Sequence, residues 1–354
     1  MKILRSIAGL LCVCGLLVFP SCNKSSPTAV LGDWTKQTPF FGIPRAGAVS
    51  FTIGTKAYVG LGFNGNVVSP NPDYPKDFWV YDVQNNIWDS VAPFPGLGRE
   101  QAVAFSLNGK GYVGTGFNRD SLVYLRDFWE FDPTANTYGQ WTRLKDFHGA
   151  ARTNAVAFDD GTYGYLGTGY NSNYFIDFYQ YNPTLDSWNI IASPSGDKRQ
   201  QAMTMTINGK TYLFGGVNNG SFTFDMWEFD PAELALGHHP WTNRTPLTTD
   251  AQYNNFRAAV NRYDAVAFTL NNKGYISTGS NGSILNTTWQ YDPSNQTFTL
   301  MTPFERFARS QAVAFVLGNE TIGYHGFVST GSQGNNYFDD MMEFLPLNAY
   351  VLNN

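Results

Sequence analysis

Cysteine is almost absent from this sequence: of 354 residues only Cys12, Cys14 and Cys22 are cysteines, and none follows residue 22. The chain beyond that point therefore has no disulfide and no thiol for catalysis or metal binding. Histidine is also scarce, with four residues, and the only adjacent pair is His238 and His239. Two neighbouring histidines in a polar segment are more typical of solvated side chains than of a metal site. We therefore expect neither a metal ion nor another cofactor.

Charged residues make up only 14% of the chain, and 23 Lys and Arg against 28 Asp and Glu give a net charge of −5. A protein that binds nucleic acid needs a basic face to contact phosphates, and this balance gives no sign of one. What the chain has instead is 35 glycines, 18 prolines and 16% aromatic residues. That composition favours a turn-rich all-β protein over a helical one.

The first 22 residues are typical of an export signal. Lys2 and Arg5 precede an apolar run at residues 7–19, which is shorter than the ~20 residues that a membrane-spanning helix needs but suits a signal peptide. Ser21 and Cys22 follow, and the sequence then becomes polar, which resembles the lipobox of bacterial lipoproteins. The resemblance implies a signal peptide at residues 1–22 with a lipid on Cys22, a short linker at 23–30 and a folded domain at 31–354.

The same segment predicts where the protein acts. We expect an exported protein of the bacterial cell envelope, held as an outer-membrane lipoprotein that faces the periplasm or the surface and contacts the membrane only through its lipid. Ordinary cleavage that leaves a secreted protein is the alternative.

One pattern recurs six times after this segment. The second copy begins Arg99-Glu-Gln-Ala-Val-Ala-Phe, turns at Asn108-Gly109, and continues through Asp127-Phe-Trp-Glu-Phe-Asp to Trp141. Successive copies start about 50 residues apart, which is the spacing of propeller blades. Each copy predicts four strands, with small residues on the first strand where blades crowd around the axis. The copies begin at Arg45, Arg99, Arg152, Arg199, Arg262 and Arg309.

The two ends of the repeat region complement each other. The sixth copy stops after its third strand, at residues 342–346, and the missing fourth strand lies at residues 34–41. Trp34 followed by Pro39-Phe40 repeats the order of Trp88 followed by Pro93-Phe94. We therefore predict an all-β, six-bladed β-propeller in which the N-terminal strand completes the last blade and removes the exposed sheet edges.

The pattern resembles kelch repeats over about residues 31–346. Only Phe214-Gly215-Gly216 keeps the glycine doublet of that family, and the other copies carry Gly-X-Gly or Ser-Thr-Gly, as in exported bacterial kelch proteins described as galactose-oxidase-like. The resemblance implies the propeller fold, and functions that range from protein-binding modules to a copper radical oxidase and a sialic acid mutarotase. Copper oxidase chemistry is argued against, because that copper site uses a tyrosine crosslinked to a cysteine and the predicted domain has no cysteine.

Long connections between the second and third strands share one face with the links between blades. Ligands usually bind where long loops gather on a rigid scaffold, so we expect the binding site on this face. Its aromatic residues are candidate ligand contacts, although packing between neighbouring loops would also explain them. These candidates are Tyr74, Tyr124, Tyr174 and Tyr337.

The six repeat arginines precede the innermost strands and are predicted to surround the channel on the same face. Six guanidinium groups there would attract a carboxylate or an acidic peptide, so all six are ligand-binding candidates. An equally consistent interpretation is structural, because an aspartate recurs at the start of the third strand, at Asp77, Asp127, Asp177, Asp225 and Asp340. The fifth copy has Thr287 instead, which predicts that Arg262 is free for a ligand unless Asp264 pairs with it.

These observations favour a monomeric, non-catalytic envelope module that binds a protein or glycan on its loop-rich face. The alternative is a carbohydrate enzyme such as a sialic acid mutarotase of the N-acetylneuraminate epimerase type. Such an enzyme needs an acid/base group near the sugar ring oxygen, and Glu100 is the weak candidate, since no other copy has a carboxylate directly after its arginine.

Overall fold

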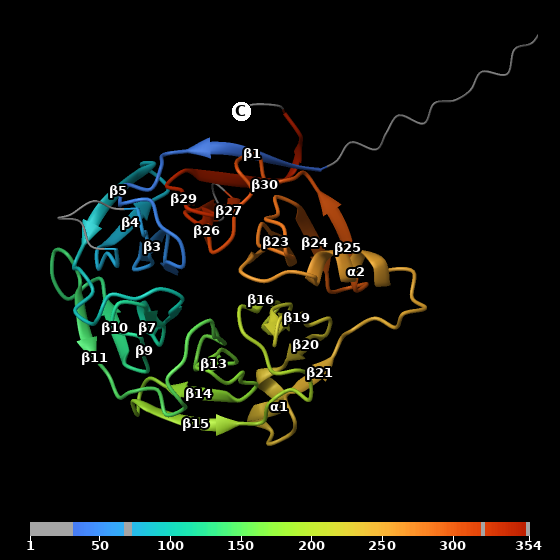
Figure 1. Ribbon diagram of the computed structural model, residues 1–354, viewed down its shortest axis with the longest axis horizontal. Helices are drawn as coiled ribbons and strands as arrows, with labels where there is room; N and C mark the ends of the chain where they lie inside the picture. Colours follow the sequence, from blue (N-terminus) through green and yellow to red (C-terminus); the bar gives the residue numbers. More distant parts are fainter. Residues whose placement is uncertain (1–30, 67–72, 320–322, 352–354) are drawn as a thin grey trace, which may run out of the picture.

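Six four-stranded antiparallel sheets surround a central channel in the computed structural model, which describes residues 31–66, 73–319 and 323–351 (Figure 1). The prediction of a six-bladed all-β propeller is confirmed. Cys22 lies outside the described residues, so its lipidation stays a prediction. No helix in the described part of the chain has the length and apolar character needed to cross a membrane.

The first three blades follow the chain order from the axis outward. Their strands are β2 (Val49–Ile53), β3 (Lys56–Gly60), β4 (Phe78–Asp82) and β5 (Ile87–Val91); β6 (Val103–Leu107), β7 (Lys110–Gly114), β10 (Phe128–Asp132) and β11 (Gln140–Arg143); and β12 (Val156–Asp159), β13 (Gly164–Gly167), β14 (Phe178–Asn182) and β15 (Ser187–Ile191).

Blades four and five repeat this order, whereas blade six takes its outermost strand from the start of the domain. Their strands are β16 (Met203–Ile207), β17 (Lys210–Phe214), β20 (Met226–Phe229) and β21 (Trp241–Asn243); β22 (Val266–Leu270), β23 (Lys273–Ser277), β24 (Thr288–Asp292) and β25 (Thr297–Met301); and β26 (Val313–Asn319), β27 (Gly323–Ser329), β30 (Met341–Ala349) and β1 (Leu31–Gln37).

Strand β1 closes the ring by pairing antiparallel with β30, with Trp34 opposite Phe344. The Trp34 ring is fully buried, lies 4.6 Å from the Phe344 ring and 4.9 Å from the Phe304 ring, and donates a hydrogen bond to the Thr302 carbonyl. The predicted closure is therefore confirmed, and blade six has four strands like the other blades.

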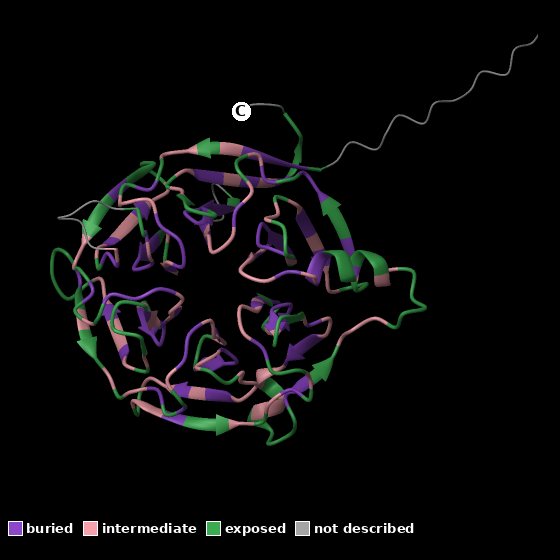
Figure 2. Cartoon of the chain, viewed as in Figure 1, coloured by how far each residue is buried: buried purple, intermediate pink, exposed green. Residues whose placement is uncertain are grey.

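At three of the six junctions between blades, an aromatic ring of one blade packs against a glycine of the next. Phe51, on the first strand of blade one, lies against Gly111 on the second strand of blade two, where an added Cβ would come within 2.1 Å of the ring. The core is accordingly a series of hydrophobic clusters between blades. Exposed residues concentrate on the outermost strands and the turns (Figure 2).

Small side chains line the channel on the first strand of every blade. One level of its wall consists only of alanine, at Ala48, Ala102, Ala155, Ala202, Ala265 and Ala312. The channel therefore stays open at this level rather than being filled by aromatic rings.

Two helices depart from the repeat, one between the third and fourth strands of blade four and one in the link between blades four and five. They are the helices α1 (Pro231–Ala235) and α2 (Tyr253–Val260). Helix α2 buries Phe256, Ala259 and Val260 in the cluster between these blades. The loop-rich face also carries three short hairpins, β8 (Phe117–Asn118) with β9 (Val123–Tyr124), β18 (Val217–Asn218) with β19 (Ser221–Phe222), and β28 (Ser332–Gln333) with β29 (Asn336–Tyr337).

Candidate functional site at the mouth of the central channel

The six repeat arginines are buried, with at most 1% of each residue exposed. Five of them form short ion pairs with the recurring aspartates. The shortest N–O distances are 2.6 Å for Arg45–Asp77, 2.5 Å for Arg99–Asp127, 2.7 Å for Arg152–Asp177, 2.5 Å for Arg199–Asp225 and 2.6 Å for Arg309–Asp340.

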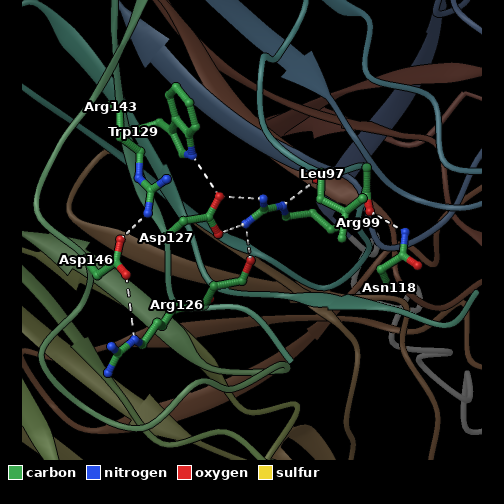
Figure 3. Close-up of polar contacts among 10 residues, drawn as sticks. Leu97, Arg99, Asn118, Arg126, Asp127, Trp129, Arg143 and Asp146 are labelled. Carbon is green, nitrogen blue, oxygen red and sulfur yellow. Dashed lines mark hydrogen bonds and ion pairs between the residues drawn. The ribbon is translucent and has the colours of Figure 1, made fainter. Parts of the chain in front are cut away.

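Arg99 shows how fully such a guanidinium is used (Figure 3). Its Nη1 and Nη2 donate to the two carboxylate oxygens of Asp127, its Nε donates to the Leu97 carbonyl at 2.9 Å, and Nη1 also reaches the Thr115 carbonyl. Asp127 accepts a further bond from the Trp129 indole at 2.8 Å. Burial by itself raises the pKa of Asp127, but the bonds and charge of Arg99 more than offset this and hold that pKa below its ordinary value. The geometry is that of structural pairs which tie the start of each blade to its third strand, and these guanidinium groups are not presented to a ligand.

Arg262 differs from the other five, although not as the sequence suggested. It is not free, because it is buried and donates to the Thr278 carbonyl at 2.9 Å and to the Thr287 carbonyl and hydroxyl. Nor does it pair with Asp264. Its Nη2 also contacts the Ala258 carbonyl in the last turn of α2, so the negative end of that helix takes the place of a carboxylate. Burial without an anionic partner lowers the pKa of Arg262 to about 10. No sequence pattern predicted this helix, which explains why the expectation of a free Arg262 was wrong.

A belt of backbone hydrogen bonds encircles the channel mouth on the loop-rich face. The residue two positions after each repeat arginine donates its N–H to the carbonyl of the corresponding residue in the preceding blade, at distances between 2.8 and 3.2 Å. All six have positive φ, which is uncommon for residues other than glycine and occurs where surrounding structure enforces it. They are Gly47, Gln101, Asn154, Gln201, Asp264 and Gln311, and all six line the mouth. Sequence reasoning missed this belt, although a polar residue at that position in five of six copies was a visible signal.

Asp264 is the one ionisable side chain of the belt. Its Oδ2 accepts hydrogen bonds from the amides of Gln201 at 2.6 Å and Gln311 at 3.0 Å, while Oδ1 has no hydrogen-bond partner among the described residues. Burial raises the pKa of Asp264 to about 6; the two amides oppose this rise, and the charge of Glu100 adds to it. A carboxyl that titrates near neutral pH at an open mouth is suited to give and take a proton.

Glu100 is buried beside this mouth, with 3% exposed, and it is paired rather than solvated. Its two oxygens accept from Nε of Arg119 at 2.5 Å and Nη2 at 3.0 Å. Burial raises the pKa of Glu100, and Arg119 offsets only part of the rise. Glycine at position 47 leaves room for Glu100, because a Cβ on residue 47 would lie only 3.3 Å from the Cβ of Glu100.

Arg119 presents the accessible positive charge of the site. Its side chain is 54% exposed, and its guanidinium lies 4.6 Å over the Phe63 ring. Glu100 occupies the Nε and Nη2 edge, and Nη1 has no partner in the described part of the chain. The group is thus held in one orientation with an edge open to an anion. Sequence reasoning did not single it out, since it belongs to no repeat position.

The four loop tyrosines pack on neighbouring loops. Tyr74 is buried against Phe63, with ring centroids 5.0 Å apart. Its hydroxyl accepts a hydrogen bond from the backbone N–H of Arg119, and burial raises the pKa of Tyr74 to about 12. Tyr337 lies 6.1 Å from the same Phe63 ring. Tyr124 and Tyr174 flank Tyr170 at 6.2 and 4.9 Å. These rings form a rigid rim, of which Tyr124, Tyr174 and Tyr337 remain partly exposed.

No group of three or more His, Cys, Asp or Glu side chains with the arrangement of a metal site occurs among the described residues.

The fold defines the class of this protein: it is a six-bladed β-propeller. A family model described as "Kelch motif" matches residues 198–235. The solved "Structure of YjhT" superposes with a TM-score of 0.68 at 16% identity, over 86% of this chain and 95% of that one, which establishes likeness of fold.

Sequence relatives match parts of the chain. The N-acetylneuraminate epimerase of Pasteurella multocida (strain Pm70) is 37% identical over 105 residues, which cover 28% of this chain and 24% of that protein. That of Yersinia enterocolitica is 38% identical over 122 residues (29% and 28%), and that of Haemophilus influenzae (strain PittEE) is 28% identical over 166 residues (46% and 41%). The matched segments thus span less than half the length of these relatives.

Proposed function

We propose that the protein binds an acidic sugar at the mouth of its central channel and interconverts the anomers of that sugar. The proposal rests on two groups near one mouth: the accessible, oriented guanidinium of Arg119 and the amide-bound carboxyl of Asp264, whose pKa burial raises to about 6. The relatives named N-acetylneuraminate epimerase support the substrate class, since N-acetylneuraminate is a sugar that carries a carboxylate.

The reaction requires proton transfer at two oxygens. Loss of the proton from the anomeric hydroxyl lets that oxygen form a carbonyl while the bond between the anomeric carbon and the ring oxygen breaks, and the ring oxygen takes up a proton. Rotation and closure from the other face reverse these steps. Asp264 accepts the first proton and supplies the second, because both its forms are populated near its pKa. The amides of Gln201 and Gln311 hold its carboxyl in place.

Substrate binding in this proposal rests on Arg119. A guanidinium binds a carboxylate through two parallel hydrogen bonds, which fixes the orientation of the sugar over the mouth. Glu100 holds Arg119 from below and is therefore a positioning residue rather than an acid or base. The belt of backbone bonds holds Asp264 in place relative to Gln101, the residue that follows Glu100.

The most informative binding experiment compares N-acetylneuraminate with neutral N-acetylglucosamine in a thermal-shift titration. We expect N-acetylneuraminate alone to raise the melting temperature, and Arg119→Leu to abolish the effect. Arg126→Leu is the matched control, because its side chain is similarly exposed at 57% but pairs with Asp146 instead. An equal shift in Arg119→Leu contradicts this assignment.

A non-catalytic module for a protein or glycan ligand is the second candidate, and the rigid aromatic rim favours it. Stabilisation by N-acetylneuraminate without faster anomer exchange supports this candidate over the enzyme. The absence of any sugar-dependent shift supports a protein ligand.

Export and lipidation remain part of the proposal. Cys22 and its flanking sequence predict an envelope lipoprotein held at the membrane by its lipid. Metabolic labelling with a palmitate analogue checks this: we expect incorporation in the wild-type chain and none in Cys22→Ala.

A further inference from the structure

A second hollow lies on the loop-rich face, between blades six and one, with a volume of about 590 Å³. This size falls within the ~300–1,000 Å³ typical of small-ligand sites. The hairpin of β28 and β29 forms one wall and Pro44, Asn64 and Asn66 form the other, while Phe307 and Phe338 complete the lining. None of the belt residues borders it, so this groove is distinct from the channel mouth.

One wall of the groove is rich in amides that point to solvent. Gln333 and Asn336 are directly opposite each other in the β28–β29 ladder, which places their side chains on the same face of the hairpin. Both are exposed, as is Asn335 in the turn between them. Each amide offers two donors and an acceptor, a combination that matches the hydroxyl groups of a sugar. The Asn66 amide donates to the Asn335 carbonyl, which ties the two walls together.

The groove also contains an aromatic platform. Phe307 is 66% exposed and stacks on Phe338, with ring centroids 5.7 Å apart and planes 7° from parallel. Phe338 in turn lies over the Arg309 guanidinium at 4.4 Å. A single exposed phenylalanine is ordinary on a protein surface. Here, however, the ring is supported from beneath and borders a row of amides, which gives it the orientation needed to cover the apolar face of a pyranose.

The lining carries no Asp, Glu, Lys or Arg side chain among the described residues. Arg309, which lies behind Phe338, is shielded by that ring and paired with Asp340 at 2.6 Å. An acidic or basic ligand would therefore lose hydration without gaining an ionic partner, whereas a neutral polyhydroxyl ligand would exchange its water contacts for amide contacts.

From these features we infer that the groove between blades six and one is a binding site for a neutral oligosaccharide. Gln333 and Asn336 hydrogen-bond its hydroxyl groups, and Phe307 stacks on a sugar ring. The site extends the proposed function, because it would hold a neutral glycan beside a mouth that takes an acidic sugar.

Isothermal titration of the full chain with maltotriose, cellotriose and triacetylchitotriose tests this inference. We expect at least one of these trisaccharides to bind with a dissociation constant of roughly 1 mM or tighter. Phe307→Ala is expected to weaken that binding roughly tenfold, as is the double variant Gln333→Ala/Asn336→Ala. Tyr138→Ala is the matched control, since Tyr138 is an aromatic residue 61% exposed in the turn between β10 and β11, and it should bind as the wild type does.

Three results would overturn the inference: no binding of any of the three trisaccharides, unchanged binding in Phe307→Ala, or displacement of the bound trisaccharide by N-acetylneuraminate. Displacement would place the neutral sugar at the channel mouth. Should Phe307→Ala fail to fold, the double variant Gln333→Ala/Asn336→Ala tests the inference by itself, because both of these amides are exposed. Unchanged trisaccharide binding in the double variant would then overturn the inference.

Discussion

Arg262 and Thr287 illustrate what a single residue changes in an otherwise regular ring. At the start of the third strand Thr287 stands where five copies have aspartate, and its hydroxyl lies 3.0 Å from the Arg262 guanidinium. The Nε of Arg262 is buried without a hydrogen-bond partner among the described residues. A buried cation that lacks a carboxylate is costly, and here helix α2 offsets only part of that cost.

Thr287→Asp is therefore expected to stabilise the protein. The new carboxylate would occupy the position that Asp127 holds beside Arg99, and we expect the free energy of unfolding to rise by about 1–2 kcal/mol. Thr287→Asn is the control, because it has the same shape without the charge. Urea denaturation measures both, and a Thr287→Asp protein no more stable than Thr287→Asn would contradict the interpretation of Arg262.

The raised pKa of Asp264 predicts that the stability of the folded protein depends on pH. Its ordinary value is 3.8 and its folded value is about 6, so the folded state binds the extra proton between these values. Stability from this group is present below pH 4, is lost as the pH rises to 6, and stays lost above it. Asp264→Asn should therefore equal the wild type in melting temperature near pH 4.

Above pH 6, Asp264→Asn should be more stable than the wild type by roughly 1–2 kcal/mol. This figure is smaller than the full pKa shift would give, because the Asp264 carboxyl is partly exposed to solvent. Asp159, whose pKa burial also raises to about 6, contributes equally to both proteins and cancels in the comparison. A stability difference that does not change between pH 4 and pH 7.5 would argue that Asp264 does not titrate in this range.

At the scale of elements, the repeat was readable from sequence because each blade uses the same few side chains for the same contacts. Trp34 and Trp88 occupy equivalent outer strands, so a tryptophan before the first copy indicated the strand that closes the ring. Helices α1 and α2 were not predictable in this way, since each lies in a connection that forms no helix in the other copies. Their consequence for Arg262 was missed with them.

Strand β1 should be essential to stability through Trp34. Replacing this fully buried ring by alanine leaves a cavity between Phe304 and Phe344, and we expect a loss of about 3–5 kcal/mol in chemical denaturation. Leu347→Ala on the partner strand β30 is the control, because that side chain is 74% exposed and should change stability little. Equal effects of the two substitutions would show that the closing strand is not packed as described.

At the scale of the whole molecule, closure of the ring brings six chain positions, each in a different blade, to one mouth. The sequence indicated the recurrence of the arginines around the channel, but not their burial, because burial depends on whether every guanidinium finds its aspartate. The pairing of Glu100 with Arg119 and the approach of Gln201 and Gln311 to Asp264 arise from contacts within a loop and between blades. Such contacts do not recur at the repeat spacing, so a single sequence does not reveal them.

The rate at which N-acetylneuraminate anomers exchange, measured by NMR line exchange at neutral pH, tests the proposed chemistry of the mouth most directly. The wild-type protein should accelerate the exchange, and Asp264→Asn should slow the catalysed rate by roughly 100-fold or more. Asp159→Asn is the matched control, since Asp159 lines the other end of the channel and should leave the rate unchanged. No acceleration by the wild-type protein, or full activity in Asp264→Asn, would contradict the assignment of acid/base chemistry to this mouth.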